Sequence, residues 1–145
     1  MKQILNHSLW IGHAADGRNT RLLLDVGIQA VVQLALEELP LAPPRELIYL
    51  RFPLLDGEDN EPALLIQAMQ TVARLLQTRI PTLVCCGGGL SRSPAIVAAA
   101  LALDDADGKE LDAWLEKMAH LGPIDVSPGL WRDILAAYQR VVASP

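Results

Sequence analysis

Short apolar segments alternate along this chain with longer segments in which hydrophobic residues recur at helical spacing. The short segments carry several β-branched and aromatic residues, which is typical of strands. They are Leu9–Ile11, Ile28–Leu36, Leu47–Phe52 (ended by Pro53) and Pro81–Cys85. Strands that alternate with helices are typical of an α/β or α+β protein.

The helical segments have recognisable first and last residues. Asn19 can accept a hydrogen bond from the first turn of a helix, and Gly27 suits the position just after its last turn. Pro62 is favoured at the first position of a helix and follows a polar loop, residues 56–61. Further helices are predicted at Ser93–Leu103, Lys109–Ala119 and Leu130–Val142.

The composition excludes several classes of protein. A chain of 145 residues, 51% of them hydrophobic, is expected to fold as one domain over residues 1–145. Its net charge of −5 argues against nucleic acid or an anionic membrane as partner, because both require a broad basic surface. The longest apolar run, Ala95–Leu103, is too short to cross a bilayer, so we expect a cytoplasmic protein. Cys85 and Cys86 are adjacent and cannot form a disulfide framework.

The segment after the strand Pro81–Cys85 carries the candidate chemistry. It contains a cysteine and an arginine separated by five residues (a CX5R loop), followed by a serine. The glycines permit positive φ angles, so that successive backbone N–H groups and the N-terminus of the next helix can bind one anion. The guanidinium of Arg92 can bind two phosphate oxygens at once. The predicted phosphate-binding residues are Gly87, Gly88, Gly89, Leu90, Ser91 and Arg92.

Cys86 is the candidate nucleophile of this loop. A positive local potential favours the thiolate, which is the reactive form of cysteine. Ser93 can donate its hydroxyl to the sulfur and stabilise it as a leaving group. A glycine-rich turn before a helix is also a common structural feature, but the combination of Cys86, Arg92 and Ser93 is far more specific.

The loop resembles the signature of the cysteine-based protein tyrosine phosphatases, and most closely that of the dual-specificity subgroup. The resemblance extends over most of the chain, through Leu9–Gly12, Leu23–Ile28, Tyr49–Asp56 and the segment from Pro123 to Tyr138. It implies a compact core with a central, mostly parallel sheet flanked by helices. It also implies hydrolysis through a phosphocysteine, without a metal or another cofactor. The implied substrates are phosphotyrosine and phosphoserine or phosphothreonine of proteins, or a small phosphomonoester.

Such a reaction needs a general acid for the leaving oxygen and a base for water. By resemblance Asp56 is the candidate, with Asp59 second and Glu58 also close in sequence. The three histidines, His7, His13 and His120, are scattered and are interpreted as surface or structural residues.

The chain departs from the family at Cys85, where the family normally places a histidine that organises the loop and tunes the thiol. A free cysteine is most often a small buried hydrophobic residue. The alternative is a redox partner of Cys86, which the strain of a vicinal disulfide disfavours.

Three other functions use similar loops. A catalytically weak or inactive module that recognises phosphate is the main alternative, and the missing histidine is what supports it. A phosphatase of inositol lipids would often carry lysines in the loop, where this chain has Gly-Gly-Gly-Leu-Ser. A sulfurtransferase would also use a cysteine loop, but Arg92-Ser93 fits phosphate better.

Overall fold

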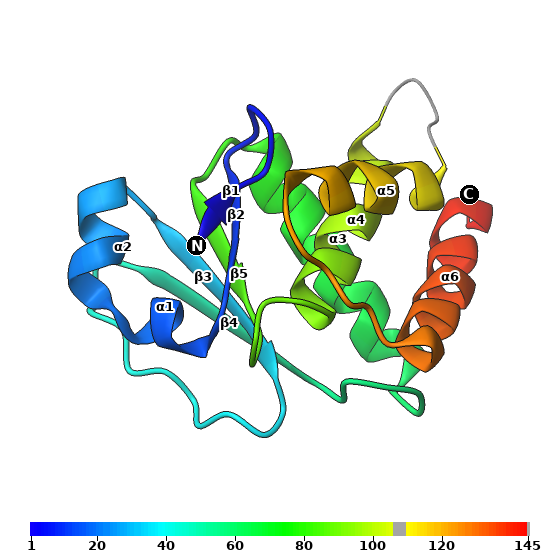
Figure 1. Cartoon of the computed structure of the whole chain (residues 1–145), viewed down its shortest axis with the longest axis horizontal. Helices are drawn as coiled ribbons and strands as arrows, with labels where there is room; N and C mark the ends of the chain where they lie inside the picture. Colours follow the sequence, from blue (N-terminus) through cyan, green and yellow to red (C-terminus); the bar gives the residue numbers. More distant parts are fainter. Residues whose placement is uncertain (106–109, 145) are drawn as a thin grey trace.

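The computed structural model describes residues 1–105 and 110–144. Five strands and six helices follow one another within these residues, as Figure 1 shows. The strands are β1 (Lys2–Gln3), β2 (Leu9–Gly12), β3 (Ala30–Ala35), β4 (Ile48–Leu54) and β5 (Thr82–Cys85). The helices are α1 (Ala14–Arg18), α2 (Thr20–Val26), α3 (Pro62–Gln77), α4 (Arg92–Asp104), α5 (Leu111–Leu121) and α6 (Pro128–Ala143).

The strands form one sheet in the order β1-β2-β5-β3-β4. Strands β2, β5, β3 and β4 are parallel, and only β1 runs antiparallel to its neighbour within the described residues. Every residue of β3 and β5 is buried, as expected for inner strands of a parallel sheet covered on both faces. The prediction of a mostly parallel sheet flanked by helices is therefore confirmed.

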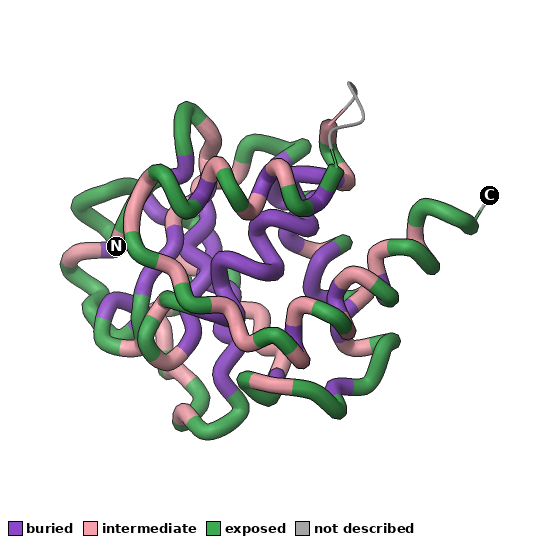
Figure 2. The backbone as a smooth tube through the Cα atoms, turned by 45° about the vertical axis from the view of Figure 1, so that its right-hand side comes forward, coloured by how far each residue is buried: buried purple, intermediate pink, exposed green. Residues whose placement is uncertain are grey.

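Helices cover both faces of this sheet. Helices α1 and α2 lie on one face and α3 to α6 on the other (Figure 1). Nearly all of α4 is buried, because it packs against the sheet and against α3, α5 and α6; Figure 2 shows this continuous buried interior. In the described parts of the chain, no helix combines the length and the apolar character needed to cross a bilayer.

The local signals for helix ends hold in the structure. The side chain of Asn19 accepts a hydrogen bond from Leu22 N at 3.1 Å, and Gly27 lies in the left-handed region with φ 90°. Pro62 is the first residue of α3. These ends were predictable because each depends on contacts within one helical turn.

Several boundaries differ from the prediction. Strand β4 continues through Pro53 to Leu54, and it can do so because an edge strand needs no second row of hydrogen bonds. Strand β3 is shorter than Ile28–Leu36, and α5 ends at Leu121 rather than Ala119. The predicted start of α5, Lys109, lies outside the described residues. Helix α1 and strand β1 were not predicted.

Candidate active site

The parallel sheet brings four chain segments to one edge. Gly12 of β2 and Gln33 of β3 both pair with Cys85 of β5, and Ala35 of β3 pairs with Leu54 of β4. Because these strands all run in the same direction, the residues that follow them meet at their carboxyl ends, where ligands bind in open α/β sheets. The residues that follow are His13 after β2, Glu37 after β3, Asp56 after β4 and the Cys86–Ser93 loop after β5.

One of the three loop glycines has the positive φ angle that the sequence predicted. Gly89 has φ 74°, whereas Gly87 and Gly88 do not lie in the left-handed region, so the prediction holds for Gly89 only. A Cβ atom on Gly89 would lie 2.9 Å from the carbonyl oxygen of Gly12. Gly89 thus permits both the turn of the loop and its close packing against the end of β2.

The loop uses its carbonyl groups to bind the scaffold and leaves its N–H groups free. Gly87 O accepts from Ala14 N at 3.1 Å, and Leu90 O accepts from Asp125 N at 2.7 Å. From Gly87 to Ser93, by contrast, no backbone N–H donates a hydrogen bond to any residue that the structure describes. Such unpaired amides at the start of a helix concentrate positive potential and suit an oxyanion.

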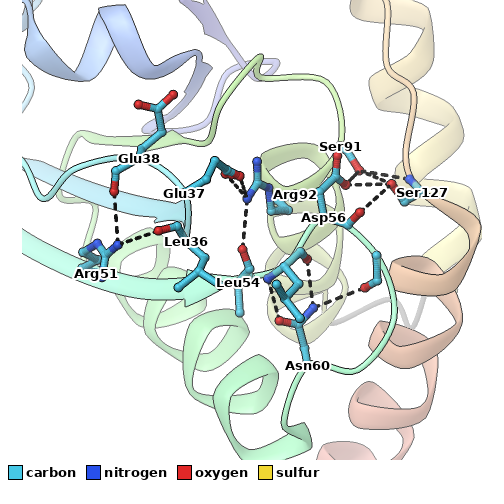
Figure 3. A network of polar contacts seen from close by, with 12 residues as sticks. Leu36, Glu37, Glu38, Arg51, Leu54, Asp56, Asn60, Ser91, Arg92 and Ser127 are labelled. Carbon is cyan, nitrogen blue, oxygen red and sulfur yellow. Dashed lines mark hydrogen bonds and ion pairs between the residues drawn. The ribbon is translucent and has the colours of Figure 1, made fainter.

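Arg92 is buried beside this loop, with 5% of its surface exposed. Its Nη1 donates to Glu37 Oε2 at 2.9 Å and to Leu54 O at 3.0 Å, as Figure 3 shows. Its Nε is buried without a hydrogen-bond partner, and its Nη2 lies 3.3 Å from a Cβ built on Gly87. Glu37 and β4 therefore hold one nitrogen of the guanidinium, and its Nε–Nη2 edge remains for two oxygens of a ligand.

Cys86 and Ser93 are both buried at the base of the loop, with 3% and 0% of their surfaces exposed. The hydroxyl of Ser93 has no hydrogen-bond partner among the described residues, so the expected hydrogen bond to the Cys86 sulfur is not made in this structure. A buried hydroxyl without a partner is unusual in a folded protein and often marks a functional site.

Asp56 follows the end of β4 and reaches the Cys86–Ser93 loop. Its Oδ1 accepts hydrogen bonds from Ser91 Oγ at 2.6 Å and from Ser127 Oγ at 2.7 Å (Figure 3). Partial burial acts to raise the pKa of Asp56, but the two hydroxyl donors and the charge of Arg92 outweigh it and hold this pKa below its ordinary value.

The two other acidic candidates make their observed contacts with α6 instead. The backbone N–H of Asp59 donates to Asp133 Oδ2 at 3.1 Å, and Glu58 Oε2 lies 3.6 Å from Arg132 Nη2. The loop that carries them is pinned by Asn60, whose side chain bonds Leu55 N, Leu55 O and Gly57 O at 2.8, 3.0 and 3.3 Å. Of the acidic residues in this loop, Asp56 is the one bonded to the Cys86–Ser93 loop.

Cys85 faces away from Cys86. Its thiol packs with Leu23, Ile28, Val31 and Leu83 under α2, whereas Cys86 belongs to the core on the other face of the sheet. Burial, together with the neighbouring Cys86, raises the pKa of Cys85 to about 12. This position favours the interpretation of Cys85 as a small hydrophobic residue over a redox partner.

Sequence reasoning missed three residues of this site. Glu37 binds Arg92, Ser127 binds Asp56, and Asn60 shapes the loop between them. Asn60 lies in a polar loop next to the acid and could have been suspected, but Glu37 and Ser127 had no local signal. Both meet their partners only through the tertiary fold.

The histidines and carboxylates of the described residues do not suggest a metal centre. No three His, Cys, Asp or Glu side chains lie together there in a way that could hold an ion. His13 has a structural role instead: its Nδ1 accepts from Asp16 N at 3.3 Å, and Asp16 Oδ2 accepts from His13 N at 3.0 Å. This reciprocal pair caps α1.

Comparison with known proteins gives a consistent result for the fold. No protein-family model and no curated protein matches the sequence. Human DUSP28 matches with a TM-score of 0.81 and 20% identity over 99% of both chains. A mouse putative dual specificity phosphatase complexed with zinc tungstate matches with a TM-score of 0.79 and 23% identity, over 97% of this chain and 87% of that one.

A third similar structure is the human tyrosine phosphatase-like serine/threonine/tyrosine-interacting protein. It matches with a TM-score of 0.74 and 20% identity, over 99% of this chain and 98% of that one. These similarities and the parallel sheet lead to the same conclusion. The chain has the compact fold of the cysteine-based protein tyrosine phosphatases of the dual-specificity type.

Proposed function

We propose that this protein is a cysteine-dependent phosphatase that hydrolyses phosphotyrosine and phosphoserine or phosphothreonine of proteins through a phosphocysteine. The observation that carries the proposal is the set of unused donors in the loop. The backbone N–H groups from Gly87 to Ser93 and the buried Nε of Arg92 have no acceptor among the described residues. Clustered donors of this kind match the oxygens of a phosphoryl group, and a buried donor without an acceptor, such as Arg92 Nε, often marks a functional site.

In the first step the thiolate of Cys86 attacks phosphorus. The new S–P bond forms as the bond from phosphorus to the leaving oxygen breaks, and the electron pair of that bond stays on the oxygen. Asp56 donates its proton to this oxygen, so that an alcohol or phenol leaves. Arg92 and the loop amides hold the remaining phosphoryl oxygens, and stabilising their charge is the main requirement of phosphoryl transfer.

In the second step water replaces the cysteine. The Asp56 carboxylate accepts a proton from water as its oxygen bonds to phosphorus. The S–P bond breaks, its electron pair returns to Cys86 as thiolate, and inorganic phosphate is released. We assign Ser93 to this step, because a hydroxyl donor beside the sulfur would stabilise the departing thiolate.

The charges around the loop support a substrate with a single phosphate. The residues between Cys86 and Arg92 carry no cationic side chain. Glu37, whose side chain is 57% exposed, places a carboxylate directly beside Arg92. A second phosphate group near Glu37 would meet this negative charge, which disfavours polyphosphorylated substrates.

The experiment that tests the proposal is the hydrolysis of 4-nitrophenyl phosphate by the wild type and by Cys86→Ser, Asp56→Ala and Asp59→Ala. We expect turnover by the wild type, none by Cys86→Ser, and a loss of about a hundredfold in Asp56→Ala, since general acid catalysis contributes roughly that much or more. Asp59→Ala is the matched control and should keep its activity. Normal turnover by Cys86→Ser would contradict the mechanism.

The alternative is a module that recognises phosphate without hydrolysing it, which the absence of the family's histidine at Cys85 supports. One of the similar structures is itself named a phosphatase-like, interacting protein. A wild type that binds inorganic phosphate through Arg92 but does not hydrolyse the aryl phosphate would support this alternative.

A further inference from the structure

Ser127 has an unusual position at the start of α6. It is the residue that precedes the helix, where a serine normally accepts a hydrogen bond from an N–H of the first turn. The side chain of Ser127 makes no such capping bond. Its hydroxyl donates instead to Asp56 Oδ1 at 2.7 Å, across a separation of 71 residues in the sequence.

Ser91 completes the same arrangement from the phosphate-binding loop. Its Oγ donates to Asp56 Oδ1 at 2.6 Å and accepts from Ser127 N at 3.0 Å. The three residues come from the loop after β4, the loop after β5 and the position just before α6, and Figure 3 shows them side by side. The contacts therefore connect three separate segments at the carboxyl group of the candidate acid.

These contacts distinguish the two oxygens of Asp56. Oδ1 accepts both hydroxyl hydrogen bonds, and Oδ2 has no hydrogen-bond partner among the described residues. A carboxyl oxygen that accepts two hydrogen bonds is a poor position for the acidic proton, which then resides on the other oxygen. We propose that Ser127 is a positioning residue that, with Ser91, fixes the Asp56 carboxyl so that Oδ2 carries the proton to the leaving oxygen.

This inference rests on the proposed function and deepens it. Hydrogen bonds from Ser91 and Ser127 also favour the charged carboxylate, which contributes to the low pKa of Asp56. Loss of the Ser127 hydroxyl should therefore have two effects: a less well oriented acid and a higher pKa of that acid.

The other charged groups of the surrounding elements are Arg92 on α4, its partner Glu37, Glu58 and Asp59 in the acid loop, Arg132 and Asp133 on α6, and Asp125 before it.

The test compares Ser127→Ala with Ser127→Thr, which retains a hydroxyl, on two substrates. Phenyl phosphate has a poor leaving group and needs the acid, whereas 4-nitrophenyl phosphate has a good one and needs it less. For Ser127→Ala we expect kcat to fall about tenfold on phenyl phosphate and less than about twofold on 4-nitrophenyl phosphate, a fraction of a whole general acid's contribution. The falling limb of kcat/KM against pH should move to higher pH, and Ser127→Thr should restore both properties.

Two further variants control for folding. Ser144→Ala removes a serine at the other end of α6, where its hydroxyl bonds Arg140 O, and should change neither property. If Ser127→Ala folds poorly, Ser127→Gly removes the same hydroxyl and places there a residue that helix N-caps tolerate much better than alanine.

The outcomes separate this inference from the proposed function. A wild type without turnover on either substrate refutes the proposed function and the role of Ser127 with it. An active wild type whose Ser127→Ala variant loses activity equally on both substrates, with an unchanged pH profile, refutes the positioning role alone. Unchanged kinetics in Ser127→Ala would refute it as well.

Discussion

Replacing Gly89 by alanine is expected to destabilise the protein far more than the same replacement at Gly88. The new Cβ on Gly89 would lie 2.9 Å from the oxygen and 3.0 Å from the carbon of the Gly12 carbonyl, and neither backbone atom can rotate away. The φ of 74° adds the cost of a left-handed conformation, which is about 1–2 kcal/mol for an L-residue. At Gly88 a Cβ would have no heavy atom within 4 Å.

The magnitude follows from these two contributions. A shift of the Gly12 backbone to relieve overpacking costs about 1–3 kcal/mol, so the total for Gly89→Ala is about 2–5 kcal/mol. For a domain of this size that corresponds to a fall in Tm of about 5–15 °C. Gly88→Ala removes only conformational freedom of the unfolded chain and should change the stability by less than about 1 kcal/mol.

The assay is thermal unfolding of both variants beside the wild type, followed by circular dichroism at one protein concentration. Since Gly88 and Gly89 are neighbours in the same loop, any general sensitivity of the loop to a methyl group would affect both. Equal values of Tm for the two variants, or a lower Tm for Gly88→Ala, would refute the reasoning.

Three other predictions follow from the same site. Glu37→Gln should raise the KM for aryl phosphate about tenfold, because the Arg92 guanidinium loses the carboxylate that holds it. The free energy of unfolding should fall by only about 1 kcal/mol, because the Glu37 side chain is 57% exposed. Steady-state kinetics and urea unfolding measure the two effects, and an unchanged KM would contradict the first. Cys85→His should destabilise the protein by about 1–3 kcal/mol, because there is little space around the Cys85 sulfur: a Cβ built on Gly17 would lie 3.0 Å from it. Cys85→Ala should keep the kcat of the wild type. A Cys85→His variant as stable as the wild type would argue against this packing. The kcat/KM of the wild type should fall as the pH rises, because a pKa of Asp56 below its ordinary 3.8 leaves the protonated acid only at low pH. Asp56→Asn should abolish this falling limb of the pH profile. If the limb persists in Asp56→Asn, it belongs to another group.

The fold and the central loop were largely predictable from the chain itself. Asn19, Gly27 and Pro62 each act within one turn of a helix, so their signals survive without knowledge of the rest of the structure. The pairing of Cys86 with Arg92 is also local, because the two residues belong to one strand–loop–helix unit. The resemblance of this unit to the dual-specificity phosphatases was enough to predict the sheet that the structure contains.

Other features were not predicted, each for its own physical reason. The end of β4 was placed too early because a proline normally interrupts a sheet, and only the strand order shows that β4 is an edge strand. Helix α1 was missed because a histidine is an uncommon N-cap, although His13 and Asp16 form a reciprocal cap there. The run of glycines suggested positive φ angles at Gly87 and Gly88 as well, but the observed loop has a positive φ only at Gly89.

The amino-acid sequence by itself predicted most of the elements and the candidate loop with Cys86 as its proposed nucleophile, since each depends on residues close together in the chain. The tertiary structure decided which carboxylate reaches that loop. Both Asp56 and Asp59 lie in one polar loop, where only the resemblance ranked Asp56 first, but the turn that Asn60 holds directs Asp56 to Ser91 and the backbone of Asp59 to α6. The physical reason is that Glu37, Asp56 and Ser127 come from different elements, and only the common direction of the parallel strands and the packing of α6 bring them together.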